Sequence, residues 1–305
     1  MWYAFFGLVV VAIVVVVAIQ VGFGGNSRSS GVEVFVDHTR TNALASGRND
    51  GDGDTVSDRT TTTTNNNNNN IHNKSITRIA CIGDSITNTT HVKIRDRTKL
   101  YPHQLSDLLG PGYEVGNYGE RAHTLSKNGR CRREGRPGSC SYWKTGVFEA
   151  ARSWNPNIVT ILLGTNDGRD FNWESNGEES FVGDYLDLIG VFAALPSRPK
   201  IYLGIPPPVV PRPGSRPGTP IFAGMLDKVI NGDLRRLVPR VAQEAVKRFG
   251  PDVIPGKGVV DTWSALGGTE GYNNRSLTVD GCHPTEIGLA VVARAFAEAI
   301  SSDSG

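Results

Sequence analysis

Residues 78–87 (RIACIGDSIT) contain a short apolar run that leads into glycine, aspartate and serine. The run 79–82 is typical of a strand buried on both faces of a parallel sheet. Gly83 breaks the run, so Asp84 and Ser85 fall at the carboxyl end of the strand, where open α/β sheets place their chemistry. A serine at such a position is more often a helix cap than a nucleophile, so this stretch alone does not define a function.

From residue 76 onward, apolar runs of strand length alternate with segments of helical period. Because parallel strands must be joined by crossover connections, this alternation predicts an α/β fold, a three-layer α/β/α sandwich with a five-stranded parallel sheet. The expected strands are 79–82, 113–115, 158–163, 200–205 and 259–260, and the expected helices are 100–109, 146–154, 181–195, 224–249 and 284–300.

Three later stretches place polar residues at strand ends or in a late loop. Residues 117–120 (NYGE) follow the second apolar segment, 164–167 (GTND) end the third, and 280–283 (DGCH) precede the last helix. Ser, Gly, Asn and His in this order resemble the four blocks of the SGNH, or GDSL-type, hydrolase family, over residues 76–302. The resemblance leans toward the carbohydrate O-acetylesterase branch, and it implies a flavodoxin-like sandwich that acts as a serine esterase. The G-x-S-x-G elbow of α/β-hydrolases is absent from the sequence.

Acyl transfer needs a nucleophile, a base that takes its proton and a group that orients the base. The resemblance implies that Ser85 is the nucleophile, His283 the base and Asp280 the orienting carboxylate. An aspartate three residues before a histidine in an irregular turn can also reach the imidazole Nδ1, and histidine exchanges protons at neutral pH. Cys282 is a poor alternative nucleophile, since adjacent side chains in an extended loop point apart.

The developing oxyanion needs two or three hydrogen-bond donors. The resemblance assigns this oxyanion hole to the backbone N–H groups of Ser85 and Gly119 and to the side-chain amide of Asn166. Glycine lets the backbone approach a substrate closely, although it is equally the default turn residue. The family often has a second glycine after the first, and here Ala122 stands nearby instead.

Composition and motif counts argue against several other classes of function. The formal net charge is only +2, and no dense basic face accompanies interleaved aromatic residues, so nucleic acid is not an expected partner. The four cysteines form no CxxC pair and the six histidines form no HExxH motif. We therefore expect neither a metal nor a cofactor, and the sequence leaves the oligomeric state open.

The amino-terminal part of the chain differs from the rest. Residues 1–23 carry no charge and are close to the ~20 residues that span a bilayer, so they predict a transmembrane anchor or a signal segment. Residues 24–75 form a low-complexity linker rich in Asn and Thr, too polar to fold alone, and residues 76–303 form the hydrolase domain. The expectation is a membrane-anchored or secreted protein whose catalytic domain is lumenal or extracellular. Glycosylation sequons, which would make it a glycoprotein, begin at Asn73, Asn88 and Asn274.

Residues 127–141 form a polar insertion that contains Cys131, Cys140 and four arginines. In an oxidising compartment the two cysteines are expected to form a disulfide, whereas Cys81 and Cys282 are expected to be buried. The arginines either attract an anionic sugar or surface, or simply belong to a solvated loop.

The predicted substrate is a small acyl ester, acetyl above all, on a sugar or polysaccharide. After residue 76, strands and helix faces account for the apolar runs, which leaves no segment for a lipase lid. Four aromatic residues could stack on sugar rings, and at least two of them are expected in the core: Trp143, Trp173, Trp263 and Tyr272. The alternatives are a lipase or lysophospholipase of the same family, or a carbohydrate-binding protein that keeps the fold without turnover.

Overall fold

The computed structural model of the chain describes residues 75–88, 94, 96–222 and 224–303. The predicted anchor or signal segment 1–23, and the linker 24–75 apart from its last residue, lie outside these residues, so both stay predictions. Among the described residues, no helix is both long and apolar enough to cross a bilayer.

Five parallel strands form one sheet in the order β2-β1-β3-β4-β5, which confirms the predicted fold class. The strand β2 continues four residues beyond the predicted segment, because it pairs with β1 along its whole length and places Gly83 opposite Gly119. The carboxyl ends of β1, β2 and β3 therefore lie at one edge of the sheet. The strands are β1 (Thr77–Gly83), β2 (Tyr113–Gly119), β3 (Ile158–Leu162), β4 (Lys200–Gly204) and β5 (Val259–Val260).

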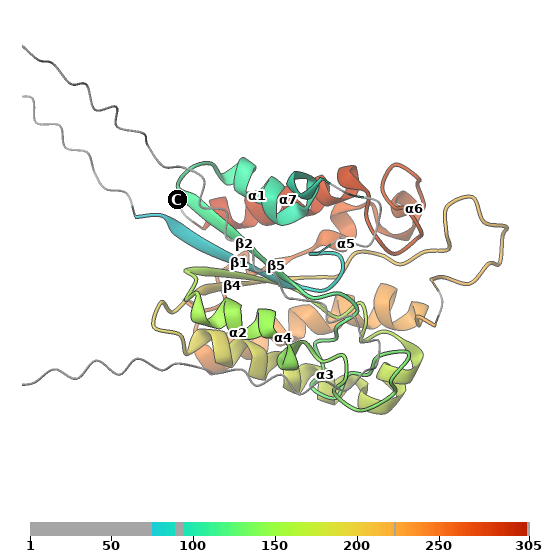
Figure 1. Cartoon of the computed structure of the whole chain (residues 1–305), viewed down its shortest axis with the longest axis horizontal. Helices are drawn as coiled ribbons and strands as arrows, with labels where there is room; N and C mark the ends of the chain where they lie inside the picture. Colours follow the sequence, from blue (N-terminus) through green and yellow to red (C-terminus); the bar gives the residue numbers. More distant parts are fainter. Residues whose placement is uncertain (1–74, 89–93, 95, 223, 304–305) are drawn as a thin grey trace, which may run out of the picture. The chain divides into compact units, whose positions relative to one another are not determined.

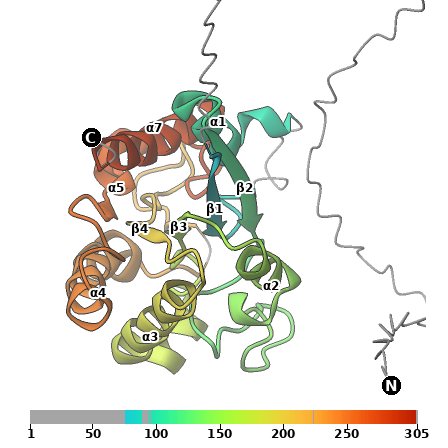
Figure 2. The ribbon, with the colours of Figure 1, turned by 90° about the vertical axis from the view of Figure 1, so that its left-hand side faces the viewer.

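Helices cover both faces of this sheet and complete the three layers (Figure 1). One face carries α1 (Tyr101–Leu109), α5 (Thr262–Ala265), α6 (Gly268–Tyr272) and α7 (Glu286–Ser302), and the other carries α2 (Gly146–Ser153), α3 (Asp170–Ala193) and α4 (Leu234–Phe249). Figure 2 shows the same division in a view turned by 90°. Short helical segments lie at Arg97–Lys99, Tyr142–Lys144 and Lys228–Asp233.

The alternation of side chains along β1 explains why one strand supports both layers. Ile79 and Cys81 join the apolar cluster formed with α1 and α7, whereas Ala80 and Ile82 join the cluster formed with α2, α3 and α4. Successive side chains of a strand point to opposite faces, so a continuous apolar run is what a doubly covered strand requires.

The helices differ from the prediction in three places. The helix expected at 224–249 is α4, which begins at Leu234 and is preceded by the short segment Lys228–Asp233. The helix expected at 181–195 begins at Asp170, because a first segment joins it across a kink at Gly177, whose φ is 69°. The short helices α5 and α6 were not predicted, since four or five residues show no helical period. None of these differences changes the order of the sheet.

The predicted disulfide between Cys131 and Cys140 is present, and Cys81 and Cys282 are free and buried. The loop that this disulfide closes is attached to α3: the Arg130 N–H donates to the Asn172 Oδ1 at 2.8 Å. Asn172 is itself buried, so it fixes the insertion to the body of the domain.

Candidate active site

A tight turn after β1 holds Ser85. Gly83 is required there, since a Cβ would lie 1.9 Å from the Thr87 hydroxyl oxygen. The Asp84 Oδ1 accepts the Ile86 N–H at 2.8 Å, and the Asn88 N–H donates to the Asp84 carbonyl at 3.0 Å. These bonds close one turn around the serine, and the buried Ile86 anchors it in the core. Asp84 thus fixes the serine turn.

The loop before α7 brings His283 and Asp280 to the serine. The Ser85 Oγ lies 3.0 Å from the His283 Nε2, and the His283 Nδ1 lies 2.9 Å from the Asp280 Oδ2. The structure therefore assembles the three residues that the sequence proposed, although the serine is separated from the histidine by 198 positions. This geometry meets the distance requirement for a nucleophile, a base and an orienting carboxylate.

Asp280 also organises the backbone of its own loop. Its Oδ1 accepts the N–H groups of Cys282 and His283 at 2.9 and 2.8 Å. Partial burial by itself would raise the pKa of this carboxyl, but the hydrogen bonds from the side chain and backbone of His283 lower the pKa to about 2. Asp280 is therefore ionised at any pH at which an esterase would work, and it can stabilise an imidazolium.

Gly119 does not reach the serine pocket, which corrects the oxyanion-hole prediction. Its N–H already donates to the Asn117 Oδ1 at 3.0 Å. A Cβ on Gly119 would lie 2.8 Å from the Asn88 backbone nitrogen, so glycine is required here for close packing of β2 against the serine turn. In the structure this glycine serves close packing, and its N–H is engaged within its own block.

Ala122 lines the pocket above Ser85, whereas Gly119 does not. Its φ is +61°, a left-handed conformation that is uncommon for a residue with a Cβ. Among the described residues, no acceptor contacts the backbone N–H of Ala122 or that of Ser85. The presence of alanine where the family often has a second glycine was the signal that could have identified this position.

Asn166 lies in the pocket, as predicted, but its amide group is engaged. The Asn166 Nδ2 donates to the Asp84 Oδ2 at 3.2 Å and to the His123 carbonyl at 3.1 Å. The backbone carbonyl of Asn166 accepts a hydrogen bond from the Asn172 Nδ2 at 3.0 Å, which links residues 164–167 to α3. Burial raises the pKa of Asp84 to about 6. Both contacts lie within the normal N–H···O range, so an oxyanion at this amide would have to share or replace one of them.

Asp167 is a further residue of the site that the sequence did not single out. It is buried, and burial raises the pKa of its carboxyl. Its two oxygens accept the N–H groups of Leu125 and Ser126 at 2.8 and 2.9 Å, and the Ser126 hydroxyl at 2.6 Å. Asp167 therefore holds the segment that follows Ala122 and fixes the shape of that wall of the pocket.

The pocket above Ser85 is small, with a volume of about 110 Å³. The Phe222 ring meets the His283 imidazole edge-on, with 5.9 Å between the ring centroids. Phe222 and Met225 supply the larger apolar side chains of the wall. The complete lining is Ser85, Arg121, Ala122, Thr165, Asn166, Arg169, Phe222, Met225, Cys282 and His283.

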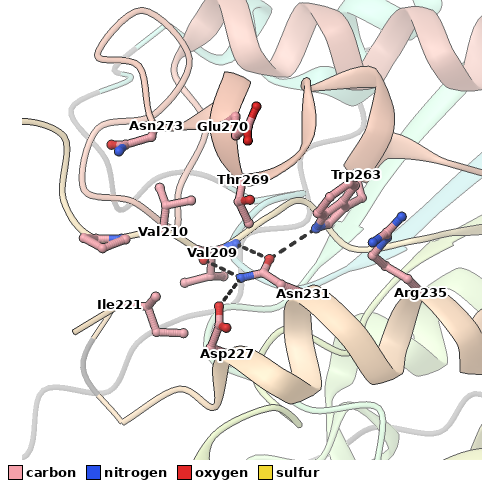
Figure 3. A pocket seen from close by; sticks show the side chains of 11 residues that line it. Val209, Val210, Ile221, Asp227, Asn231, Arg235, Trp263, Thr269, Glu270 and Asn273 are labelled. Carbon is pink, nitrogen blue, oxygen red and sulfur yellow. Dashed lines mark hydrogen bonds between the residues drawn. The ribbon is translucent and has the colours of Figure 1, made fainter. Parts of the chain in front are cut away.

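A larger pocket, of about 520 Å³, lies elsewhere and includes no residue of the Ser85–His283–Asp280 triad (Figure 3). Its central side chain, Asn231, is engaged in hydrogen bonds within the protein. The Asn231 Nδ2 donates to the Val209 carbonyl, and the Asn231 Oδ1 accepts the Val209 N–H and, at 3.2 Å, the Trp263 Nε1–H.

The four aromatic residues proposed for sugar stacking do not line the triad pocket, and Tyr272 is fully buried.

The described residues contain no group of His, Cys, Asp and Glu side chains that could hold a metal ion. The arrangement around Ser85 contains the groups that acyl transfer requires: a nucleophile, a base and an orienting carboxylate.

The chain matches the family model described as the GDSL-like lipase/acylhydrolase family over residues 81–291. The chain belongs to this family. It is therefore a member of a family of carboxylic ester hydrolases, as the four sequence blocks predicted.

A curated relative is the acetylxylan esterase of Xylanibacter ruminicola, 30% identical over 241 residues. The match covers 73% of this chain but only 43% of that protein, so the chain spans less than half the length of the relative. Two solved structures share the fold: Est24, a carbohydrate acetylesterase from Sinorhizobium meliloti (22% identity, TM-score 0.51), and the aryl esterase of M. smegmatis (21%, 0.51). Each covers 74% of this chain and 99% of the solved chain.

Replacing Ala122 by glycine is expected to stabilise the fold by about 0.5–1 kcal/mol, because the relief of left-handed strain exceeds the added entropy of the unfolded chain. Activity should be retained, because the backbone N–H remains. The matched control is Ala150→Gly within α2, which should destabilise by about 0.5–1 kcal/mol. Denaturant unfolding measures both, and equal destabilisation by the two changes would contradict the strained conformation of Ala122.

Proposed function

We propose that the chain hydrolyses short acyl esters, acetyl above all, of a carbohydrate through an acyl-enzyme intermediate. The observation that carries this proposal is the small pocket directly above a hydrogen-bonded Ser85–His283–Asp280 chain. The 30% identical acetylxylan esterase supports the acetyl group and the carbohydrate.

In the first half-reaction the Ser85 Oγ attacks the ester carbonyl carbon while its proton passes to the His283 Nε2. The negative charge that forms on the carbonyl oxygen is stabilised by the N–H groups of Ser85 and Ala122, with the Asn166 amide as a third donor. Each such donor contributes about 3–4 kcal/mol to the stability of the transition state. Asp280 holds the imidazole by its Nδ1 and stabilises the charge that the ring acquires.

Collapse of the tetrahedral intermediate breaks the bond to the alcohol oxygen, which takes the proton from the His283 Nε2 and leaves. A water molecule then attacks the acyl group on Ser85 and transfers its proton to the same nitrogen. The second collapse releases the carboxylic acid and returns the proton to the serine oxygen. Every proton in this sequence passes through His283, which explains why one histidine suffices.

A lipase of the same family is the alternative, and acyl chain length distinguishes the two. Phe222 and Met225 are the larger apolar side chains of the small pocket, so we place the acyl group against them. We therefore expect kcat/KM for p-nitrophenyl esters to fall beyond about four acyl carbons, since each extra methylene in a filled pocket costs roughly 1–3 kcal/mol.

Met225→Ala is the matched variant for this test. It should raise kcat/KM for the hexanoyl ester relative to the acetyl ester, because it removes one wall of the pocket while leaving the triad intact. If the unmodified protein instead prefers esters of eight or more carbons, the short-acyl proposal is wrong and a lipase is indicated.

A further inference from the structure

A second pocket, of about 520 Å³, lies at the same edge of the sheet as Ser85. Val209 reaches it from the loop after β4, and Trp263 reaches it from the helix after β5. The triad pocket is lined by residues that follow β1, β2 and β3. Because the five parallel strands lie in the order β2-β1-β3-β4-β5, their carboxyl ends form one row, and the two pockets are neighbours along it.

The wall between the two pockets is thin. Phe222 lines the triad pocket, whereas the preceding residue, Ile221, lines the larger one. The loop that carries His283 also borders both pockets, since the Val210 N–H donates to the Gly281 carbonyl at 2.8 Å. Neighbouring strands lie about 4.8 Å apart, so β1 is about 12 Å from the point midway between β4 and β5. One extended ligand of that length can therefore reach both pockets.

The walls of the larger pocket combine apolar surface with polar side chains (Figure 3). Val210 and Ile221 supply apolar surface, whereas Thr269, Glu270 and Asn273 bring polar groups from α6 and the residues after it. Among the residues that the structure describes, none makes a hydrogen bond or an ion pair with the side chains of these three polar residues. Their hydrogen-bonding groups are therefore available to a ligand in the pocket.

Two further polar groups of this pocket are held in place by the protein. The Arg235 guanidinium carbon lies 3.7 Å from the centroid of the Trp263 ring. Because the guanidinium covers that face of the indole, Trp263 positions a cation there instead of offering a stacking surface. The Asp227 Oδ1 accepts the Asn231 Nδ2–H at 2.7 Å, which fixes the orientation of the carboxylate. Groups that are already ordered lose less conformational entropy when a ligand binds.

The chemistry of these groups favours a neutral ligand that is rich in hydroxyl groups. Two carboxylates, of Asp227 and Glu270, face one guanidinium, of Arg235, so an anionic ligand is disfavoured. A hydroxyl group donates one hydrogen bond and accepts others, so it can satisfy a carboxylate, a guanidinium or the amide of Asn273. The C–H groups of a sugar ring can meanwhile contact the apolar surface.

We propose that the pocket over β4 and β5 binds neutral sugar residues of the glycan chain whose acetyl ester reaches Ser85. The acyl group occupies the small pocket, so the sugar that carries it lies at the mouth, and the chain continues along the row of strand ends. The preferred substrate is then an oligomer or polymer, not a single acetylated sugar. This inference rests on the proposed esterase function and adds a second binding site to it.

The test compares p-nitrophenyl acetate, which is too short to reach the second pocket, with partially acetylated neutral oligosaccharides graded from the disaccharide to the hexasaccharide. Xylan and glucomannan supply two such series, and the series that the unmodified protein hydrolyses faster is used. The ratio of kcat/KM for the oligosaccharide to kcat/KM for the aryl ester should rise with chain length until the chain spans both pockets. A ratio that does not depend on chain length would overturn the inference.

The double variant Glu270→Ala/Asn273→Ala should lower this ratio about tenfold for the longest oligosaccharide, the effect of 1.4 kcal/mol, through a higher KM. The ratio for the disaccharide should not change. Both side chains are exposed, so the fold should tolerate their loss, and either single variant should show a smaller effect in the same direction. Glu298→Ala, which removes an exposed carboxylate on α7 that lines neither pocket, is the control and should leave every ratio unchanged.

An unchanged ratio in the double variant, with activity on the aryl ester intact, would contradict the second site and leave the esterase function standing. Loss of activity on every acetyl ester in the unmodified protein would instead disprove the proposed function.

A binding measurement tests the second site without turnover. The Ser85→Ala protein, titrated calorimetrically with the unacetylated hexasaccharide of the neutral series, should bind it, and adding Glu270→Ala/Asn273→Ala should weaken that binding about tenfold, or by 1.4 kcal/mol. Hexagalacturonate, a chain of the same length with a carboxylate on each unit, should bind more weakly. Tighter binding of this anionic chain would overturn the assignment to neutral sugars.

Discussion

Replacing Ser85 by alanine is expected to reduce kcat for an aryl acetate by about 10⁵- to 10⁶-fold, the scale found when a nucleophile that acts as a unit with its base is removed. His283→Ala should cause a loss of similar size, because the serine oxygen then has no group to take its proton. The double variant should be little worse than either single variant, since the two residues perform one step together. Steady-state kinetics on the three proteins measures this.

The fold should survive these changes, since Ser85 lies in a turn held by Asp84 and Ile86 rather than by its own hydroxyl. Far-UV circular dichroism and the unfolding midpoint provide the check. Ser175→Ala, an exposed serine on α3, is the matched control and should keep full activity. Additive losses in the Ser85 and His283 variants would show that the two side chains do not act as a unit.

Replacing Asp280 by asparagine should lower kcat by about 10³- to 10⁴-fold, less than the loss of His283. The asparagine oxygen can still accept the N–H groups of Cys282 and His283, so the loop keeps its shape. What is lost is the negative charge that fixes the tautomer of the imidazole and stabilises its protonated form. A loss as large as that of His283→Ala would mean that Asp280 does more than orient the base.

The same substitution predicts a pH dependence of stability with a defined sign. The pKa of Asp280 is lowered to about 2 in the folded protein, against about 3.9 for an unperturbed aspartate. The carboxylate therefore stabilises the fold fully above pH 4, and this contribution disappears as the pH falls through 2. Asp280→Asn should lower the free energy of unfolding at pH 7, and the difference from the unmodified protein should shrink toward pH 2. Ser175→Ala, which removes an exposed hydroxyl that does not titrate, is the control and should differ from the unmodified protein by the same amount at every pH.

The sequence by itself determined the sheet and the triad. The buried strands read as apolar runs because both faces are covered, and the alternation with helices leaves few topologies. Ser85, Asn166 and His283 could be identified because the four ordered blocks resemble those of the SGNH family. Their places at strand ends or just before a helix agree with that resemblance. Asp280 could be placed for a similar local reason, since three residues of one turn separate it from the imidazole.

The tertiary structure alone decided which backbone groups face the pocket. Gly119 ends β2 and Ala122 lies three positions later in the loop that follows, and the resemblance favoured the glycine. The side chain of Asn117 takes the N–H of Gly119, whereas the buried carboxylate of Asp167, from another strand end, shapes the segment after Ala122. The N–H of Gly119 thus has a partner two residues away, whereas the shape of the segment after Ala122 depends on a carboxylate more than forty residues away in the sequence.

The lining of the pocket was decided in the same way. Arg121 and Arg169 belong to loops that follow different strands. Because β2 and β3 both flank β1 in a parallel sheet, their carboxyl ends converge on Ser85 and bring the two guanidinium groups to one cavity. Local sequence determined the chemistry of each loop, and only the order of the strands determined which loops meet.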